Sequence, residues 1–107
     1  NWHATSPVCS PSRASVLTGK YPQRAGIVQV LTSRPTFDVP GLKPGENTLA
    51  RSLQGAGYRT AAVGKWHVGS APESRPMAQG FDEFYGFYSG WIDYYSTRYY
   101  TLSGNPG

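Results

Sequence analysis

Glycine and proline interrupt this chain about once every five residues, and that spacing limits it to short helices and strands. The 107 residues include 13 glycines and 9 prolines. Glycine supplies the backbone conformations that tight turns need, and proline cannot continue the interior of a helix or of a central strand. We therefore expect many turns joined by short elements.

One helix–turn–strand pattern indicates the fold class. A helix is predicted over residues 48–54, with Leu49 and Leu53 four apart on its buried side. Two glycines end this helix, and residues 58–64 then have the composition of a short strand. A helix, a tight turn and a strand make half of an α/β unit. The pattern therefore predicts an α/β fold with a mostly parallel sheet.

A second helix is predicted over residues 10–19. Ser10 is suited to the N-cap, Pro11 to the first helical position and Gly19 to a left-handed stop. Residues 20–46 are rich in glycine and proline and are predicted to be mostly loop.

Composition favours one small folded domain. Leu, Ile, Val and Phe make up about 18% of the chain, just under the ~20% below which composition suggests disorder. The formal net charge is only +4 and aromatic residues reach 14%, which argues against disorder. We expect a thin aliphatic core supplemented by aromatic rings.

Several classes of partner and site are disfavoured. The 10 basic residues are scattered and not clustered, so no nucleic-acid partner is predicted. No apolar run approaches the ~20 residues of a membrane span. The single cysteine excludes an internal disulfide framework, and one cysteine with two histidines makes a self-contained zinc site improbable.

The chain begins Asn-Trp-His without an initiator methionine and ends Asn-Pro-Gly in a loop-like sequence. We expect residues 1–107 to be an internal part of a larger protein, truncated at both ends. For that reason the ends indicate no compartment.

Cys9 and Arg13 form the first candidate site, at the start of the helix predicted over residues 10–19. A helix N-terminus favours anions and lowers the cost of an anionic sulfur or oxygen. Arg13 in the first turn opposes the helix dipole unless an anion lies nearby. The alternatives are a buried, unreactive Cys9 and a surface Arg13.

Lys65 and His67 form the second candidate site. If the strand predicted over residues 58–64 continues, their side chains point to the same face. They would lie where the strand ends, which is where open α/β sheets bind ligands. A lysine and a histidine there can hold an anion and exchange a proton. The alternatives are chance exposure or a packed histidine; Trp66 on the opposite face is predicted to lie in the core.

An aromatic segment covers residues 91–100. Exposed rings can stack on sugars or on bases. Half-buried packing of the kind found in strands is the alternative explanation.

Four segments of the chain resemble the type I, formylglycine-dependent sulfatases. Residues 7–19, P-V-C-S-P-S-R-A-S-V-L-T-G, match the first signature of that family, and residues 57–67, G-Y-R-T-A-A-V-G-K-W-H, match the second. Residues 80–86 and 93–95 resemble the corresponding part of arylsulfatase-B-like members. The resemblance implies an alkaline-phosphatase-like α/β domain with a mostly parallel central sheet flanked by helices. Residues 1–107 would then be an incomplete part of its N-terminal catalytic domain.

The resemblance also implies a chemistry. Cys9 would be converted to formylglycine by a formylglycine-generating enzyme that reads the motif Cys9-x-Pro11-x-Arg13. The hydrated aldehyde would be the nucleophile that hydrolyses a sulfate monoester. One diol oxygen would also bind a divalent cation, Ca²⁺ in most relatives, so that residue 9 would be a metal ligand.

Roles for four further residues follow from the same resemblance. Arg13 would orient the formylglycine diol, Lys65 would contact the sulfate, and His67 would hydrogen-bond to the diol. Ser89 lies near a position that can touch the substrate sulfate in the family, but its spacing differs by about one residue from the spacing in relatives. The remaining metal ligands would lie outside residues 1–107, so we expect the isolated chain to be inactive.

The implied substrate is a sulfated small molecule or a sulfated carbohydrate, and the implied compartment is the periplasm, the secretory path or the lysosome. Two other functions remain open at this point. Phosphonate monoester and phosphodiester hydrolases share the Cys9-x-Pro11-x-Arg13 motif, and a non-catalytic binder of sulfated glycans would also keep a basic pocket.

Overall fold

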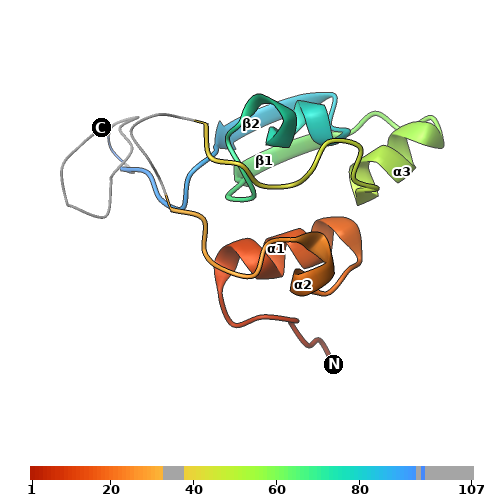
Figure 1. The fold of residues 1–107 in the computed structure, drawn as a ribbon. Coiled ribbons are helices and arrows are strands. Elements are labelled where there is room, and N and C mark those ends of the chain that lie inside the picture. Colours follow the sequence, from red (N-terminus) through yellow and green to blue (C-terminus); the bar gives the residue numbers. More distant parts are fainter. Residues whose placement is uncertain (33–37, 94, 96–107) are drawn as a thin grey trace.

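A computed structural model describes residues 1–32, 38–93 and 95 of the chain. Its elements are short, as the glycine and proline content predicts. In chain order they are α1 (Cys9–Thr18), α2 (Pro22–Ala25), α3 (Leu49–Gly55), β1 (Ala61–Lys65), two turns of 3₁₀ helix (Pro72–Ser74 and Met77–Gln79) and β2 (Glu83–Phe87). Figure 1 shows α1 and α2 together on one side of the two strands. No helix in this part of the chain is long and apolar enough to cross a membrane.

Helix α1 begins one residue earlier than predicted, which makes Cys9 its first residue. Val8 occupies the N-cap position without a side-chain cap, so the predicted cap by Ser10 is wrong. Ser10 is instead fully buried, and its Oγ accepts a hydrogen bond from the Leu31 N–H at 3.1 Å. The predicted stop at Gly19 is confirmed: its φ is 69°, and its N–H donates to the Ser15 carbonyl.

Residues 20–46 contain one element that the sequence did not predict. Pro22 starts the short helix α2, since its missing N–H costs nothing at a first helical position. Gly26 ends this helix in the left-handed conformation, with φ at 79°. The rest of the described part of residues 20–46 is irregular, as predicted.

Helix α3 lies within one residue of its predicted position, but it buries a different face. Thr48 is the N-cap and accepts from the Arg51 N–H at 3.2 Å. Leu49 and Leu53 are exposed, and the buried residue is Ala50. The backbone of Gly80 lies against this helix, since a Cβ at Gly80 would lie 2.6 Å from the Arg51 nitrogen. The predicted burial of the two leucines is therefore wrong.

Strands β1 and β2 pair in parallel, with Ala61 opposite Glu83 and Lys65 opposite Phe87. This confirms the predicted α/β class and its parallel pairing. Strand β1 begins at Ala61 and not at the predicted residue 58. The preceding Thr60 is held by Asp82, whose Oδ2 accepts from the Thr60 N–H at 2.8 Å. The Thr60 carbonyl accepts in return from the N–H groups of Asp82 and Glu83.

The core lies between the helices α1 and α2 and one face of the strands. Its buried residues are Ala14, Ala25, Ile27, Leu42, Trp66 and Val68. The indole of Trp66 meets Phe81 edge to face, and its Nε1 donates to the Ser74 carbonyl at 2.9 Å, which confirms the prediction that it is a core residue. The other face of the sheet is open, since Val63 and Tyr85 pair in register and are 81% and 82% exposed. Most of the aromatic segment over residues 91–100 lies outside the described residues.

The burial pattern predicts unequal effects for two leucines. Leu42→Ala removes a fully buried side chain and should lower the free energy of unfolding by about 2–5 kcal/mol. Leu49→Ala, at a position 56% exposed, should cost less than about 1 kcal/mol. Urea denaturation of both variants checks this difference. Equal losses would contradict the observed orientation of α3.

Candidate functional site

Cys9 lies half-buried at the start of α1 and faces a small cavity. The cavity has a volume of about 130 Å³ and is lined by Cys9, Val30, Leu31, Thr32, Lys65, His67, Gly90 and Trp91. The first helix, the end of β1 and the turn after β2 thus contribute to one hollow. Three of the predicted site residues, Cys9, Lys65 and His67, share it.

Lys65 and His67 reach this cavity by a route that differs from the predicted one. Strand β1 ends at Lys65, and His67 has a φ of 58°, which is uncommon for a residue with a side chain. The alternation of side chains along a continued strand therefore does not explain where the side chains of Lys65 and His67 lie. The turn is held instead by the N–H groups of Trp66 and His67, which donate to the carbonyls of Phe87 and Tyr88.

Arg13, in the second turn of α1, joins this helix to the end of β1. Its Nη1 donates to the Lys65 carbonyl at 2.7 Å. Arg13, Lys65 and Cys9 also line a second, open cleft of about 370 Å³ together with Ser6, Pro7, Val8 and Ser12. The structure therefore brings all four predicted catalytic residues together, because Cys9 and Lys65 line both hollows. Two cations beside the start of a helix make this a favourable place for an anion.

The imidazole of His67 is buried and held at one nitrogen. Its side chain is 4% exposed, and Nε2 lies 2.6 Å from the Leu31 carbonyl oxygen. Because a carbonyl can only accept, Nε2 carries the proton of this bond. Nδ1 is buried and has no hydrogen-bond partner among the described residues. A neutral ring therefore offers a free acceptor at Nδ1.

Burial lowers the pKa of His67 below its ordinary value of 6.5. The bond to the Leu31 carbonyl opposes that shift, and the positive charges of Lys65 and Arg13 add to it. The imidazole is therefore neutral at neutral pH and can accept a proton.

The structure places Ser89 beside the cavity but with its hydroxyl engaged elsewhere. Its Oγ donates to the Trp91 carbonyl at 2.7 Å. Its neighbours Gly90 and Trp91 line the cavity, whereas Ser89 is not among the lining residues. Its predicted contact with substrate stays a prediction.

The described residues do not by themselves make a cation site. Over residues 1–32, 38–93 and 95, no three His, Cys, Asp or Glu side chains gather where they could hold a metal ion. Asp82 is committed to Thr60 and Gln54 through its two carboxylate oxygens. Among the site residues, only residue 9, once it carries oxygen, could be a hard-cation ligand.

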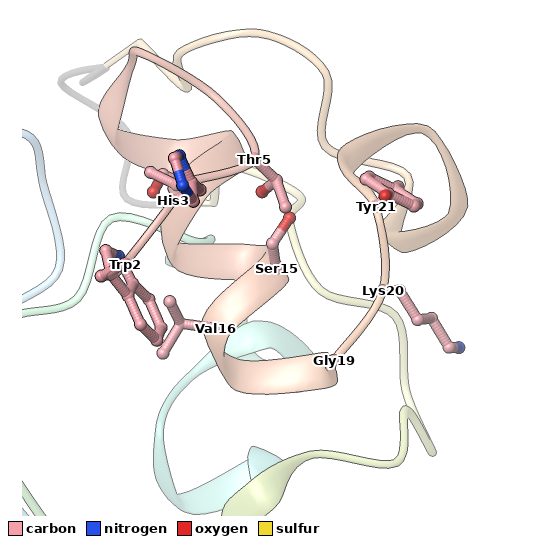
Figure 2. Close-up of a pocket in the computed structure, with 10 residues that line it drawn as sticks. Trp2, His3, Thr5, Ser15, Val16, Gly19, Lys20 and Tyr21 are labelled. Atoms are coloured by element: carbon pink, nitrogen blue, oxygen red, sulfur yellow. The ribbon is translucent and has the colours of Figure 1, made fainter.

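A separate pocket of about 340 Å³ lies between the N-terminal segment and α1 (Figure 2). Figure 2 shows Trp2 beside Val16, with the side chains of Thr5 and Ser15 turned toward each other. None of Cys9, Arg13, Lys65 and His67 lines it. This pocket is therefore not the site that the sequence predicts.

Sequence reasoning missed the groups that hold His67. These are the main chain of Leu31, the hydroxyl of Ser10 and the bare Cα of Gly90, against which the imidazole ring lies. No local pattern indicates a main-chain carbonyl as a partner, and Ser10 resembled an ordinary helix cap. Only the tertiary structure identifies them.

Comparisons with a family model and with known proteins point to the same family. The family model described as "Sulfatase" matches residues 1–105. The chain is 41% identical over 91 residues to an N-acetylgalactosamine-6-sulfatase from Sus scrofa, covering 80% of this chain and 17% of that protein. It is 44% identical over 92 residues to a steryl-sulfatase from Mus musculus, covering 78% and 15%.

A solved structure is also similar. The crystal structure of Ps i-CgsB in complex with k-i-k-neocarrahexaose has a TM-score of 0.78 and 36% sequence identity to this chain. The match covers 85% of this chain and 20% of that one. The chain thus spans about a fifth or less of the length of these relatives.

The lowered pKa of His67 predicts that acid reduces the stability of the fold. Between the unfolded value near 6.5 and the lower folded value, the unfolded chain binds more protons. The free energy of unfolding should therefore be retained above about pH 6.5 and fall as the pH drops toward the folded pKa.

Denaturation at steps between about pH 7.5 and about pH 5 measures this slope. His67→Gln should flatten the slope over this range, whereas His3→Gln, at an exposed position, should keep it. The same slope in the wild type and in His67→Gln would refute the assignment.

Proposed function

The chain belongs to the sulfatase family, and on that premise we propose that it forms part of an active site that hydrolyses sulfate monoesters. The nucleophile would be formylglycine made from Cys9. The observation that carries the proposal is the shared cavity, in which residue 9 lies with Lys65 and His67. Arg13 joins them through the cleft on the other side of Cys9 and Lys65.

The reaction needs a nucleophile that can also release its product. In the hydrated aldehyde at residue 9, one hydroxyl would give up its proton as its oxygen attacks the sulfur and the ester S–O bond breaks, and the alcohol would leave with that proton. The second hydroxyl would then lose its proton, the C–O bond to the sulfate would break, and sulfate would depart as the aldehyde re-forms. Addition of water to the aldehyde would restore the diol.

The geometry supports a role for each neighbour in these steps. Neutral His67 offers a buried acceptor at Nδ1, for which a hydroxyl of the diol is a suitable donor. Lys65 and Arg13 supply the positive charge that a sulfuryl group requires as negative charge develops on its oxygens. Arg13 is preoriented because its guanidinium is already bonded to the Lys65 carbonyl.

A divalent cation, Ca²⁺ by family resemblance, would supply further charge at the diol. The described residues do not complete its ligand set. For the substrate we propose a sulfated carbohydrate. The support is the carrahexaose complex of one structural relative and the N-acetylgalactosamine-6-sulfatase name of another.

Conversion of Cys9 is the first expected outcome. In the protein that carries this chain, purified from its own host, mass spectrometry should find an aldehyde in place of the thiol in the peptide that ends at Arg13. Cys9→Ala should abolish sulfate release without unfolding the protein. An intact thiol in a host that performs the conversion would instead favour a non-catalytic binder of sulfated glycans.

The two cations should matter for the chemical step. Lys65→Ala and Arg13→Ala should each lower kcat for an aryl sulfate, per formylglycine-containing molecule, by about 10²- to 10³-fold, because each removes positive charge from the transition state. Since Arg13 belongs to the conversion motif, mass spectrometry first measures the formylglycine content of Arg13→Ala. Arg24→Ala, at an exposed position in α2, is the matched control and should leave kcat unchanged. Parallel assays with an aryl phosphonate ester decide between the sulfatase and the phosphonate hydrolase, since the proposal requires sulfate to be the faster substrate.

A further inference from the structure

The ring of His67 is held from two sides by groups that take no part in the proposed chemistry. We infer that Ser10, the Leu31 peptide group and Gly90 are positioning residues, which fix the tautomer and the orientation of His67. This inference rests on the proposed function, because it concerns how His67 is presented to residue 9.

On the first side of the ring, two hydrogen bonds connect Ser10 to His67 through the main chain of Leu31. The Leu31 N–H donates to the Oγ of Ser10 at 3.1 Å, and the Leu31 carbonyl accepts from Nε2 of His67 at 2.6 Å. Ser10 is fully buried in α1, directly after the proposed nucleophile. The serine hydroxyl therefore ties the segment that contacts His67 to the helix that carries residue 9.

The second side is the Cα of Gly90. A Cβ there would lie 2.7 Å from Cε1 and 2.9 Å from Nε2 of His67, closer than real Cβ contacts. Gly90 directly follows Ser89 in the turn after β2, and it lines the same cavity as His67. Any side chain at position 90 would push the ring away from the Leu31 carbonyl.

This arrangement fixes which nitrogen carries the proton. Since Nε2 must donate to the carbonyl, neutral His67 presents an unprotonated Nδ1. The charged groups that face the ring are Lys65 and Arg13, and both disfavour a second proton on it. Loss of the Leu31 contact would free the ring to adopt the other tautomer and to turn away from residue 9.

Ser10 is a suitable position for a test because the conversion motif Cys9-x-Pro11-x-Arg13 leaves position 10 open. In the protein that carries this chain, Ser10→Ala should lower kcat for 4-nitrophenyl sulfate, per formylglycine-containing molecule, by about 10- to 100-fold. KM should change less than about twofold, because binding of the substrate is not altered. Ser10→Thr keeps the hydroxyl and should recover part of the loss.

Ser15→Ala is the matched control for Ser10→Ala. Ser15 is a buried serine on the same helix, and its hydroxyl has no hydrogen-bond partner in the part of the chain that the structure describes. It should keep the wild-type kcat. A wild-type kcat in Ser10→Ala, or an equal loss in Ser15→Ala, would overturn the role of Ser10.

Gly90→Ala tests the other side of the ring and does not depend on the folding of α1. Its kcat should fall to a similar degree with little change in KM. Gly55→Ala is the control, because a Cβ at Gly55 meets nothing within 4 Å. Full activity in Gly90→Ala would overturn the role of Gly90.

A double-mutant cycle separates positioning from general destabilisation. In a His67→Gln background, Ser10→Ala and Gly90→Ala should cause no further loss of kcat, because both act through the imidazole. Additive losses would overturn the inference. If the wild-type protein contained no formylglycine or released no sulfate, the proposed function would be refuted instead. Failure of the positioning roles is therefore distinguishable from failure of the proposed function.

Discussion

The parallel pairing of β1 with β2 is the constraint on which the site depends. Parallel strands end at the same edge of a sheet, so the residues that follow β1 and those that follow β2 emerge side by side. The pairing starts where Asp82 and Thr60 exchange hydrogen bonds and continues past both strands to the bond between His67 and Tyr88. Because of it, Gly90 lies against the ring of His67 although 23 residues separate them in the sequence.

The grouping of the candidate site residues could be predicted from the sequence because it depends on residue types in short motifs. Cys9 and Arg13 belong to one turn of helix, and Lys65 and His67 to one strand end, so local spacing was enough to group each pair. That the two pairs meet was implied only by the family resemblance. In the structure they meet through one bond, from the Arg13 guanidinium to the Lys65 carbonyl.

The predictions that failed concern side chains whose surroundings come from distant parts of the chain. Ser10 has the chemistry of a cap, but the Leu31 peptide competes for its hydroxyl. Leu49 and Leu53 have helical spacing, but the backbone of Gly80 packs against α3 at Arg51, and the buried residue of the helix is Ala50. In both cases the residue lies on an element that contacts a main-chain segment distant in the sequence. A local pattern of side chains does not predict where such a segment lies.

The open face of the sheet links folding to association. Parallel sheets are ordinarily covered on both faces, yet Val63 and Tyr85 form an exposed apolar pair in the middle of β1 and β2. Water in contact with that pair weakens the hydrophobic gain from ordering the strands. Whatever covers this face therefore also stabilises the strand ends that hold Lys65 and His67. The geometry of the candidate cavity is thus set partly by contacts on the opposite side of the sheet.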